Sequence, residues 1–501
     1  MRITNGMMIN NSLANINVNK LNVDKWSTQQ STGKKIQKPS DDPIIAVRAL
    51  RFRSQLTELT QYLDKNIPDA ESWMNVTEDA LTGVSDLMQS MQKYLDQAAN
   101  DTYNEKNRKD IAETLQQYKE QIFQDANADY AGRRVFAGFK TDTDMTFRTD
   151  TEQRYDITEN ITMDSIDTVT KIKNLVSVDT VTNIPLTDNP DMHEVYRIRL
   201  SYEKLSSGTC QITDSQGNPP AGITIKRVTA DAQGVYKDEN GNVIQDIYSP
   251  TNNDAYFLAD TGELILSENA HQNLLTAMNN ETLSVTYTKE NFEKNDLRPE
   301  QYFDCVSYEA DGTTKKNKYS NTVQDILYTV NFNQKLKVNT EGKNVFTHNI
   351  VRDVDELLNN VEAAQAAQSK VDAIKNMMKE QKYAGDTDQK NLQSMLEAAE
   401  KELALADDIM QKSFERGITK FQGHQKVVDA AVADVGSRTK RLELNKERLG
   451  SQETVYEELK SSNEDINLPE TIIRLAAASM VYDASLSATS KIITKSLLDY
   501  L

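Results

Sequence analysis

The distribution of proline divides this chain into three parts. Six of the ten prolines lie between Pro185 and Pro299, and none lies between residues 300 and 468. Proline removes a backbone donor and clashes with the preceding helical turn, so its absence leaves room for long helices. Residues 1–140 and 353–501 carry apolar side chains at spacings of three and four, which is typical of amphipathic helices. We therefore expect long helices in both terminal parts of the chain and a different structure between them.

The middle of the chain changes to a period of two. Apolar and polar residues alternate strictly at three places: residues 196–202, 283–287 and 328–332. Asn240-Gly241 and Asp311-Gly312 are typical of hairpin turns between such runs. The pattern predicts one or two β-rich domains with a short helix near residues 269–278.

Together these periods predict an α+β fold. The apolar stripe at each end is too narrow to be stable alone, so we expect each end to pair with the other in a helical bundle of coiled-coil type. We place terminal assembly helices at residues 1–38 and 465–501, the helical bundle at 39–147 and 346–464, and an inserted β-rich part at 148–345.

Two helix boundaries at the front have clear signals. Gly33 ends a first helix over about residues 7–30, and Asp41 or Asp42 can cap the next helix, with Pro43 in its first turn. Pro68 should kink or break that second helix. Its apolar heptad is Leu56, Leu59, Leu63, Ala70, Trp73, Thr77, Ala80, Val84, Leu87, Met91, Tyr94 and Ala98.

The remaining helices are expected over four ranges before the last one. These are residues 104–130, 354–380, 388–415 and 424–460. Pro469 then opens a final helix that reaches the last residues, Ser496-Leu497-Leu498-Asp499-Tyr500-Leu501. An apolar tail of this kind usually becomes buried in something.

The terminal helices carry the candidate assembly surface. Six asparagines surround the apolar stripe of residues 7–30, and asparagine is a poor helix former. We therefore expect residues 1–35 and 465–501 to be disordered in an isolated subunit and helical only against a partner. The candidate interface residues are Ile9, Leu13, Ile16, Leu475, Tyr482, Leu486, Ile493 and Leu497.

The charge balance excludes several partners. A net charge of −19 supplies no dense basic face for nucleic acid or for an anionic membrane surface. No apolar run approaches the roughly 20 residues of a membrane span. We see no cleavable secretory signal, although some export machines read an uncleaved terminus. Cys210 and Cys305 could pair or remain buried thiols.

Sequence motifs near both ends occur in a specific order and spacing. The front motifs are Met1–Asn5, Ser31-Thr32-Gly33-Lys34-Lys35-Ile36, Pro39-Ser40-Asp41-Asp42-Pro43, Asn127-Ala128 and Gly132–Gly138. The back motifs are Val338-Asn339 with Val345-Phe346, Val435–Arg438, Asn463-Glu464-Asp465 and Ser496–Leu501. Over about residues 1–147 and 325–501 the chain resembles the hook–filament junction proteins of the flagellin family. Residues 148–324 carry no such resemblance.

The resemblance implies a secreted structural protein of the bacterial flagellum. Such proteins leave the cell unfolded through the flagellar type III apparatus, with a chaperone bound near the C-terminus. They self-assemble as a ring, between a neighbouring junction protein on the hook side and flagellin on the filament side. Their terminal segments fold on assembly into a concentric helical tube. The resemblance thus implies a flagellin-like fold and no cofactor.

Flagellin itself is the alternative within this family. Flagellins usually have Asp-Asp-Ala-Ala where this chain has Asp41-Asp42-Pro43-Ile44, and they usually lack the closing Asp-Tyr-Leu of residues 499–501. These differences favour the junction protein.

The residues typical of enzymes are scattered. His193, His271, His348 and His424 show no zinc-hydrolase spacing, and there is no phosphate-binding loop or Cys-x-x-Cys pair. Residues 238–242 faintly resemble a calcium loop but lack the spaced ligands, and a hairpin turn explains them better. We expect no enzyme and no metal. A junction subunit whose central domain also binds an extracellular ligand remains an alternative.

Overall fold

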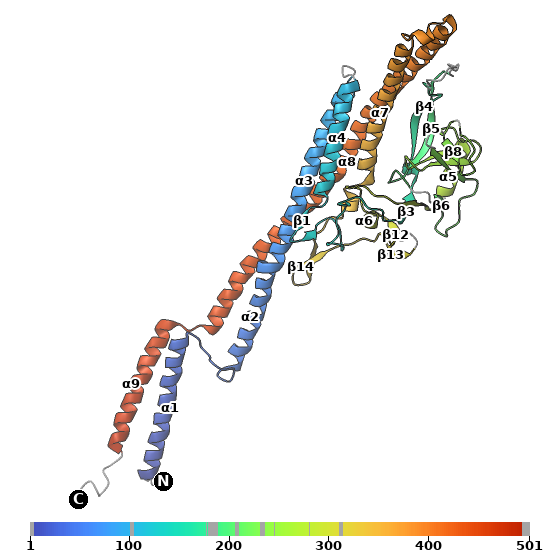
Figure 1. The fold of residues 1–501 in the computed structure, drawn as a ribbon. Coiled ribbons are helices and arrows are strands. Elements are labelled where there is room, and N and C mark those ends of the chain that lie inside the picture. The colour runs from blue at the N-terminus through green and yellow to red at the C-terminus, as the bar shows by residue number, and fades with distance from the viewer. Residues whose placement is uncertain are drawn as a thin grey trace. The chain divides into compact units, whose positions relative to one another are not determined.

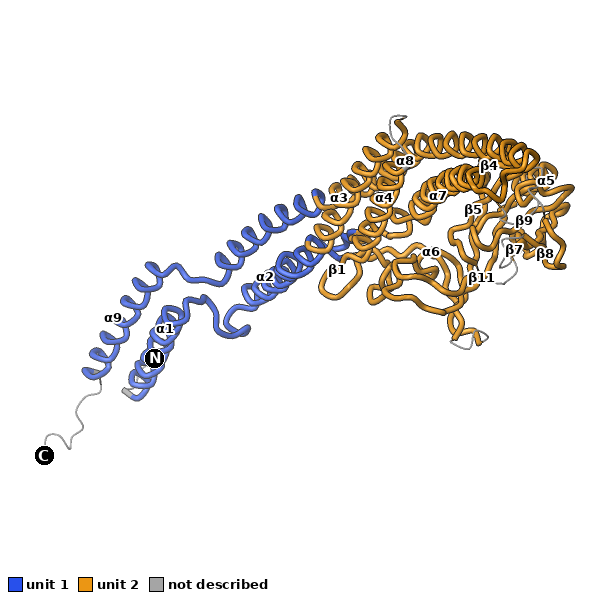
Figure 2. The backbone as a smooth tube through the Cα atoms, turned by 45° about the horizontal axis from the view of Figure 1, so that its top comes forward, with its two compact units in different colours: residues 1–71, 328–336, 440–501 blue, residues 72–327, 337–439 orange. Residues whose placement is uncertain are grey.

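The computed structural model describes residues 5–100, 105–176, 178, 189–205, 210–230, 236–244, 246–279, 281–309 and 314–492. The chain forms two compact units (Figure 2). Unit 1 comprises residues 1–71, 328–336 and 440–501, and unit 2 comprises residues 72–327 and 337–439.

Unit 1 contains the two terminal helices and the helices next to them. Helix α1 (Asn5–Thr32) and helix α9 (Leu468–Ile492) lie side by side (Figure 1). Helix α2 (Pro43–Gln61) begins after Asp42, whose carboxylate accepts hydrogen bonds from the backbone N–H groups of Ile44 and Ile45. The predicted cap is thus confirmed at Asp42, with Pro43 in the first turn.

The break expected at Pro68 is a widened turn. A π-helical segment (Tyr62–Asn66) separates α2 from helix α3 (Ile67–Ala98). Proline has no N–H and its ring meets the carbonyl four residues earlier, so a π turn at this point relieves the conflict while the chain stays helical.

Unit 2 places helices from both ends of the chain together. Helix α4 (Glu105–Asp125) packs on helix α7 (His348–Met377), and Lys119 forms a 2.6 Å ion pair with Asp355. Gln92 of α3 donates to Phe421 O at 3.3 Å and to Gln425 Oε1 at 2.7 Å in helix α8 (Asp386–Glu464). The α+β prediction, with helical ends and a β-rich centre, is confirmed.

Two helix predictions were wrong. The helix expected over residues 104–130 ends at Asp125, because Asn127 bonds to Thr146 and to the backbone of Met145, and strands β1 (Asp129–Tyr130) and β2 (Arg133–Arg134) follow. The break expected between residues 415 and 424 is absent, since α8 is one helix of 79 residues. A Cβ on Gly417 would lie 3.3 Å from Leu95 and 3.6 Å from Leu357, so this glycine permits close packing rather than a turn.

The β-rich region of unit 2 contains two larger sheets. The six-stranded sheet has the order β4 (Ile166–Lys173), β5 (Asp191–Arg199), β10 (Glu263–Leu266), β9 (Asp254–Leu258), β7 (Thr224–Ala230), β8 (Tyr236–Asp238). The five-stranded sheet has the order β13 (Lys315–Tyr319), β12 (Asp304–Tyr308), β3 (Tyr155–Ile161), β11 (Leu283–Lys289), β6 (Gln211–Thr213). The pairs are antiparallel except β7 with β9.

The two sheets share one hydrophobic core. It joins buried side chains of β3, β5, β9, β10 and β11 with helix α5 (Glu268–Met278), which matches the short helix expected there. Cys210 and Cys305 are buried in this core as free thiols. Helix α6 (Pro299–Tyr302) is a further short element of unit 2. The hairpin of β14 (Leu327–Asn331) with β15 (Gln334–Lys337) lies almost wholly in unit 1, which contains residues 328–336.

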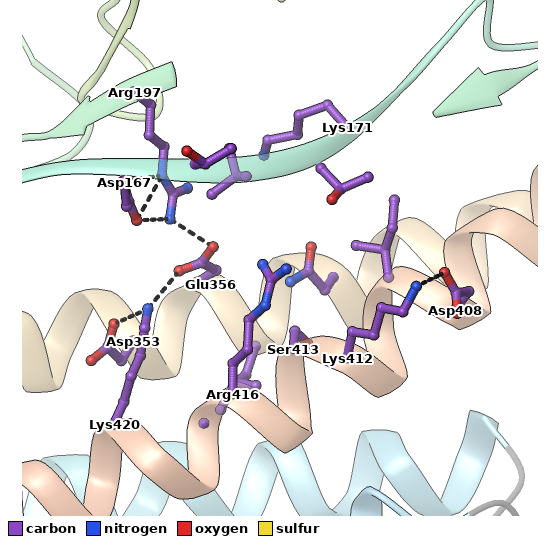
Figure 3. Close-up of a pocket in the computed structure, with 17 residues that line it drawn as sticks. Asp167, Lys171, Arg197, Asp353, Glu356, Asp408, Lys412, Ser413, Arg416 and Lys420 are labelled. Carbon is purple, nitrogen blue, oxygen red and sulfur yellow. Dashed lines mark hydrogen bonds and ion pairs between the residues drawn. The ribbon is translucent and has the colours of Figure 1, made fainter. Parts of the chain in front are cut away.

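A buried charge network joins the six-stranded sheet to the long helices within unit 2. Arg197 of β5 has a side chain only 2% exposed, and it donates to Asp167 at 3.0 Å, Glu263 at 2.6 Å and Glu356 at 2.7 Å. Figure 3 shows Glu356 reaching from α7 to this guanidinium. A buried cation is stable only when its donors are satisfied, and these three carboxylates satisfy the guanidinium of Arg197. Of the three, Glu356 lies on α7, so its ion pair with Arg197 holds β5 against that helix.

Candidate functional site: an assembly surface on the terminal helices

Helices α1 and α9 pack together as an antiparallel pair. Asn19 Nδ2 of α1 donates to Ser485 Oγ of α9 at 2.5 Å. Ile16 lies on the same face of α1 as Asn19, and Tyr482 lies on the same face of α9 as Ser485; both are half-buried. The guanidinium of Arg474 lies 5.0 Å from the ring centroid of Trp26, close enough for a cation–π contact.

The helix pair is closed by a polar clamp where the chain enters and leaves it. We call Lys34, Arg53, Glu464 and Asp465 the clamp residues. Gly33 adopts a φ of +69°, which favours glycine, and its carbonyl accepts from Ile466 N at 3.0 Å. Lys35 N donates to Glu464 O at 2.7 Å. The segment after α1 is therefore held against the turn between α8 and α9.

Glu464 is the centre of the clamp. Its side chain is 3% exposed and accepts two hydrogen bonds from Arg53, at 2.8 Å and 2.6 Å. Lys34 lies 3.5 Å from the same carboxylate and also bonds to Asp465. The hydrogen bond from Arg53 lowers the pKa of Glu464, and the hydrogen bond from Lys34 lowers the pKa of Asp465. Both carboxylates are thus held in their charged form.

The eight predicted interface residues fall into three groups. Ile9, Ile16, Leu475 and Tyr482 are half-buried on the faces where α1 and α9 meet. Leu13 is 47% exposed and Leu486 is 42% exposed. Ile493 and Leu497 lie outside the described residues. A role of these residues in assembly stays a prediction.

The helix pair leaves many large apolar side chains in contact with water. On α1 these are Met7, Met8, Leu13, Val18 and Leu21. On α9 they are Leu468, Ile472, Ile473, Met480, Val481 and Leu486. Exposed apolar side chains gathered on one element commonly mark a surface that binds another protein. The pairing of α1 with α9 therefore uses only part of the apolar surface that the two helices carry.

The clamp was not predicted from the sequence. Lys34 and Glu464 belong to two motifs of the flagellin-family resemblance, and both motifs lie at the ends of long helices. Charged residues beside a helix-ending glycine could have suggested an ion pair, but not its partner more than four hundred positions away.

Neither a metal site nor a membrane span is found in the described part of the chain. Among those residues, no three His, Cys, Asp or Glu side chains gather closely enough to hold a metal ion. None of the described helices combines the length and apolar character that a bilayer crossing requires.

Comparison with known proteins relates the helical front of the chain to one family. Residues 3–141 match the family of the bacterial flagellin N-terminal helical region. This front region is therefore similar to the N-terminal helical region of flagellins. The flagellin-type region thus contains α1, α2, α3, α4 and the β1–β2 hairpin.

Two curated relatives extend this relation. Flagellar hook-associated protein 3 of Salmonella typhimurium is 33% identical over 144 residues, which are 28% of this chain and 45% of that protein. Flagellin of Clostridium tyrobutyricum is 31% identical over 127 residues, which are 25% of this chain and 33% of that protein. The chain thus covers less than half the length of either flagellin-family relative.

Solved structures give a weaker likeness. The crystal structure of flagellar hook-associated protein 3 from Legionella pneumophila aligns with 82% of this chain and 97% of its own length, at 13% identity and a TM-score of 0.30. A superposition with so low a score adds nothing to the relation found by sequence.

Proposed function

We propose that this protein is a structural subunit of the bacterial flagellum that joins the hook to the filament. The observation that carries the proposal is the exposed apolar surface on α1 and α9, in a chain whose front region is of flagellin type. The relation to a protein named flagellar hook-associated protein 3 favours the junction over other flagellar positions.

Assembly follows from the energetics of this surface. Burying a large apolar side chain contributes roughly 1.5–3 kcal/mol, whereas ordering a residue costs roughly 1–2 kcal/mol. Half-buried stripes on α1 and α9 cannot offset that cost alone, but stripes covered by neighbouring subunits can. The terminal helices therefore order when subunits form a ring, and the helices next to them in the sequence, from both ends of the chain, form a coiled-coil bundle.

A position between the hook and the filament also determines which proteins this subunit contacts. One face of the ring contacts the neighbouring junction protein on the hook, and the other contacts flagellin. Delivery outside the cell uses the type III apparatus, and a chaperone covers the C-terminal region before export. The protein acts by packing and is not an enzyme.

Deletion of the gene tests the proposal. In the bacterium that encodes this chain, the deletion strain should assemble hooks without filaments and release flagellin into the medium. Expression of the full chain should restore filaments. A deletion strain that still grows filaments of normal length would contradict the proposal.

A filament subunit is the second candidate, and the relation to Clostridium tyrobutyricum flagellin favours it. A filament subunit is needed in very large numbers, whereas a junction ring needs few copies. Quantifying this chain against the other proteins of purified flagella separates the two, since a filament subunit would be the major component.

A further inference from the structure

Helix α2 and the last part of helix α8 form an antiparallel pair within unit 1 (Figure 1). The ring centroids of Phe52 and Tyr456 lie 6.4 Å apart, and Asn463 Nδ2 donates to the carbonyl oxygen of Ile45 at 3.1 Å. Because Ile45 precedes Phe52 while Asn463 follows Tyr456, the two helices run in opposite directions. These contacts define the inner face of each helix, and the opposite faces point away from the pair.

The outward face of α2 is apolar and cationic. Ile44, Val47 and Leu50 are each more than half exposed. Arg51 follows Val47 by four positions, so it lies on the same face, and it is also exposed. Residues 43–57 contain three arginines and no acidic residue. In a chain with a net charge of −19, this helix is therefore a locally cationic surface.

The outward face of α8 is apolar and anionic. Leu444 and Val455 are each more than half exposed. Glu447 follows Leu444 by three positions, and Glu458 follows Val455 by three, so the four side chains lie along one exposed stripe. Residues 442–458 contain five glutamates and only two basic residues. The two helices of the pair thus present outward faces of opposite charge, each with exposed apolar side chains.

Arg51 and Glu458 lie at nearly the same level along the helix pair. Phe52 faces Tyr456, so Arg51 is one residue and Glu458 two residues from that level, in the same direction. At the helical rise of about 1.5 Å per residue, the two charges differ in level by only about 1.5 Å. Among the described residues, neither of them forms an ion pair. Within one subunit they point away from each other, so only a second molecule can bring them together.

A second copy of this chain carries the matching surface. Two copies placed side by side at the same level would bring the cationic face of α2 against the anionic face of α8. Contacts between two different faces are heterologous, and they build closed rings or open helical assemblies. Elsewhere on so acidic a chain, two copies repel each other, so complementary charges at this contact fix the register of neighbouring subunits.

We propose that the outward face of α2 in one subunit binds the outward face of α8 in the next, with Arg51 against Glu458. The inference rests on the proposed assembly of subunits into a ring and identifies a lateral contact between neighbours. This contact is separate from the apolar surface of α1 and α9, because it uses only α2 and the last part of α8.

Cross-linking on purified flagella tests this contact. Ser54 continues the stripe of α2 three positions after Arg51, and by the helical rise it lies within about 1.5 Å of the level of Val455. A chain carrying S54C and V455C, treated with a short bismaleimide, should give covalent dimers and longer ladders. Each single variant should stay monomeric, because like faces do not meet. Cys210 and Cys305 are buried, so the wild-type chain should give no product.

Charge reversal in the S54C/V455C chain tests the ion pair. R51E and E458R should each reduce the cross-linked fraction roughly tenfold or more, because like charges then face each other at every contact. The combined R51E/E458R change should restore cross-linking to the level of the parent chain. E457R is the matched control: Glu457 is also exposed, but it lies on a different face of α8 and should not affect the product.

Thermal melts of the secreted variants should match the parent, since Arg51 and Glu458 are exposed. Cross-links in a single-cysteine variant, absence of a ladder from chains present on the flagella, or no rescue by R51E/E458R would overturn this contact while leaving the proposed function intact. A wild-type chain that is absent from purified flagella would instead refute the proposed function and this contact with it.

Discussion

Truncation of Trp73 tests the packing of unit 2 most sharply. Trp73 of α3 is 1% exposed, and its ring meets Tyr130 edge-on with centroids 6.1 Å apart. The guanidinium of Arg133 lies 5.1 Å from the same ring. Replacing a buried tryptophan by alanine costs roughly 3–5 kcal/mol, and lost ring contacts of this kind make up about 0.5–1.5 kcal/mol of it. We therefore expect Trp73→Ala to lower the free energy of unfolding by about 3–5 kcal/mol.

Urea denaturation, monitored by the circular dichroism signal of the helices, measures this loss in the free energy of unfolding. The chain has two tryptophans, so Trp26→Ala is the natural control. Trp26 lies in α1 of unit 1, and its removal should change the unfolding of unit 2 by no more than about 0.5 kcal/mol, as for independent sites. A loss below about 1 kcal/mol for Trp73→Ala, which is the size of a surface substitution, would refute the packing described for α3.

Three further changes have distinct expected outcomes. Leu486→Asp should leave the monomer's stability within about 0.5 kcal/mol, as for other surface changes, yet stop filament growth, while Ser487→Asp should allow it; microscopy and secreted protein in the medium check both. Burial opposes the charge of Glu356, but Arg197, Lys420 and Arg199 outweigh it and lower its pKa to about 2. Because this folded-state pKa is below the ordinary value of 4.5, Glu356 stabilises the protein above that value and loses its effect as pH falls toward 2. In thermal melts, Glu356→Gln should therefore differ from the wild type at pH 6 and approach it near pH 2. Gly417→Leu should cost about 1–3 kcal/mol in urea denaturation, whereas Gly423→Leu, where a side chain meets open space, should not destabilise.

A different result would contradict each of these three predictions. Secreted Leu486→Asp protein that supports normal filaments would place assembly elsewhere. A constant difference between Glu356→Gln and the wild type from pH 6 to pH 2 would mean that this carboxylate is not held charged. Equal losses for the two glycine variants would mean that helix α8 does not pack closely at Gly417.

Local signals in the sequence predicted much of the fold. Proline placement and the change of period separated the helical ends from the β-rich centre, and the cap at Asp42 followed from its position before Pro43. These features depend only on residues that lie near one another in the chain, so the local sequence is sufficient to predict them.

The heptad of α3 could be predicted only in part. Ala70, Thr77, Val84, Met91 and Ala98 are buried as expected. At the alternate positions Leu81, Met88 and Leu95 are buried, in place of the expected Ala80, Leu87 and Tyr94. Spacings of three and four both fit a helix, and both neighbours at these positions are apolar, so only the packing partner decides which side chain is covered.

Long-range contacts were beyond the reach of sequence reasoning. The clamp at Glu464 and the network around Arg197 join residues far apart in the chain. In the sequence, these charged residues cannot be distinguished from the many charged residues that lie in solvent on an acidic protein. Gly417 and Gly423 also looked alike, and only the contacts of Gly417 with Leu95 and Leu357 distinguish them.

The position of the subunit on the flagellum tests the central claim most directly. An epitope inserted between Asn240 and Gly241, in an exposed hairpin turn, can be located on intact flagella by immunogold electron microscopy. A junction subunit predicts a single narrow band of gold where the hook meets the filament. Gold along the whole filament, or no gold on the flagellum, would contradict the account.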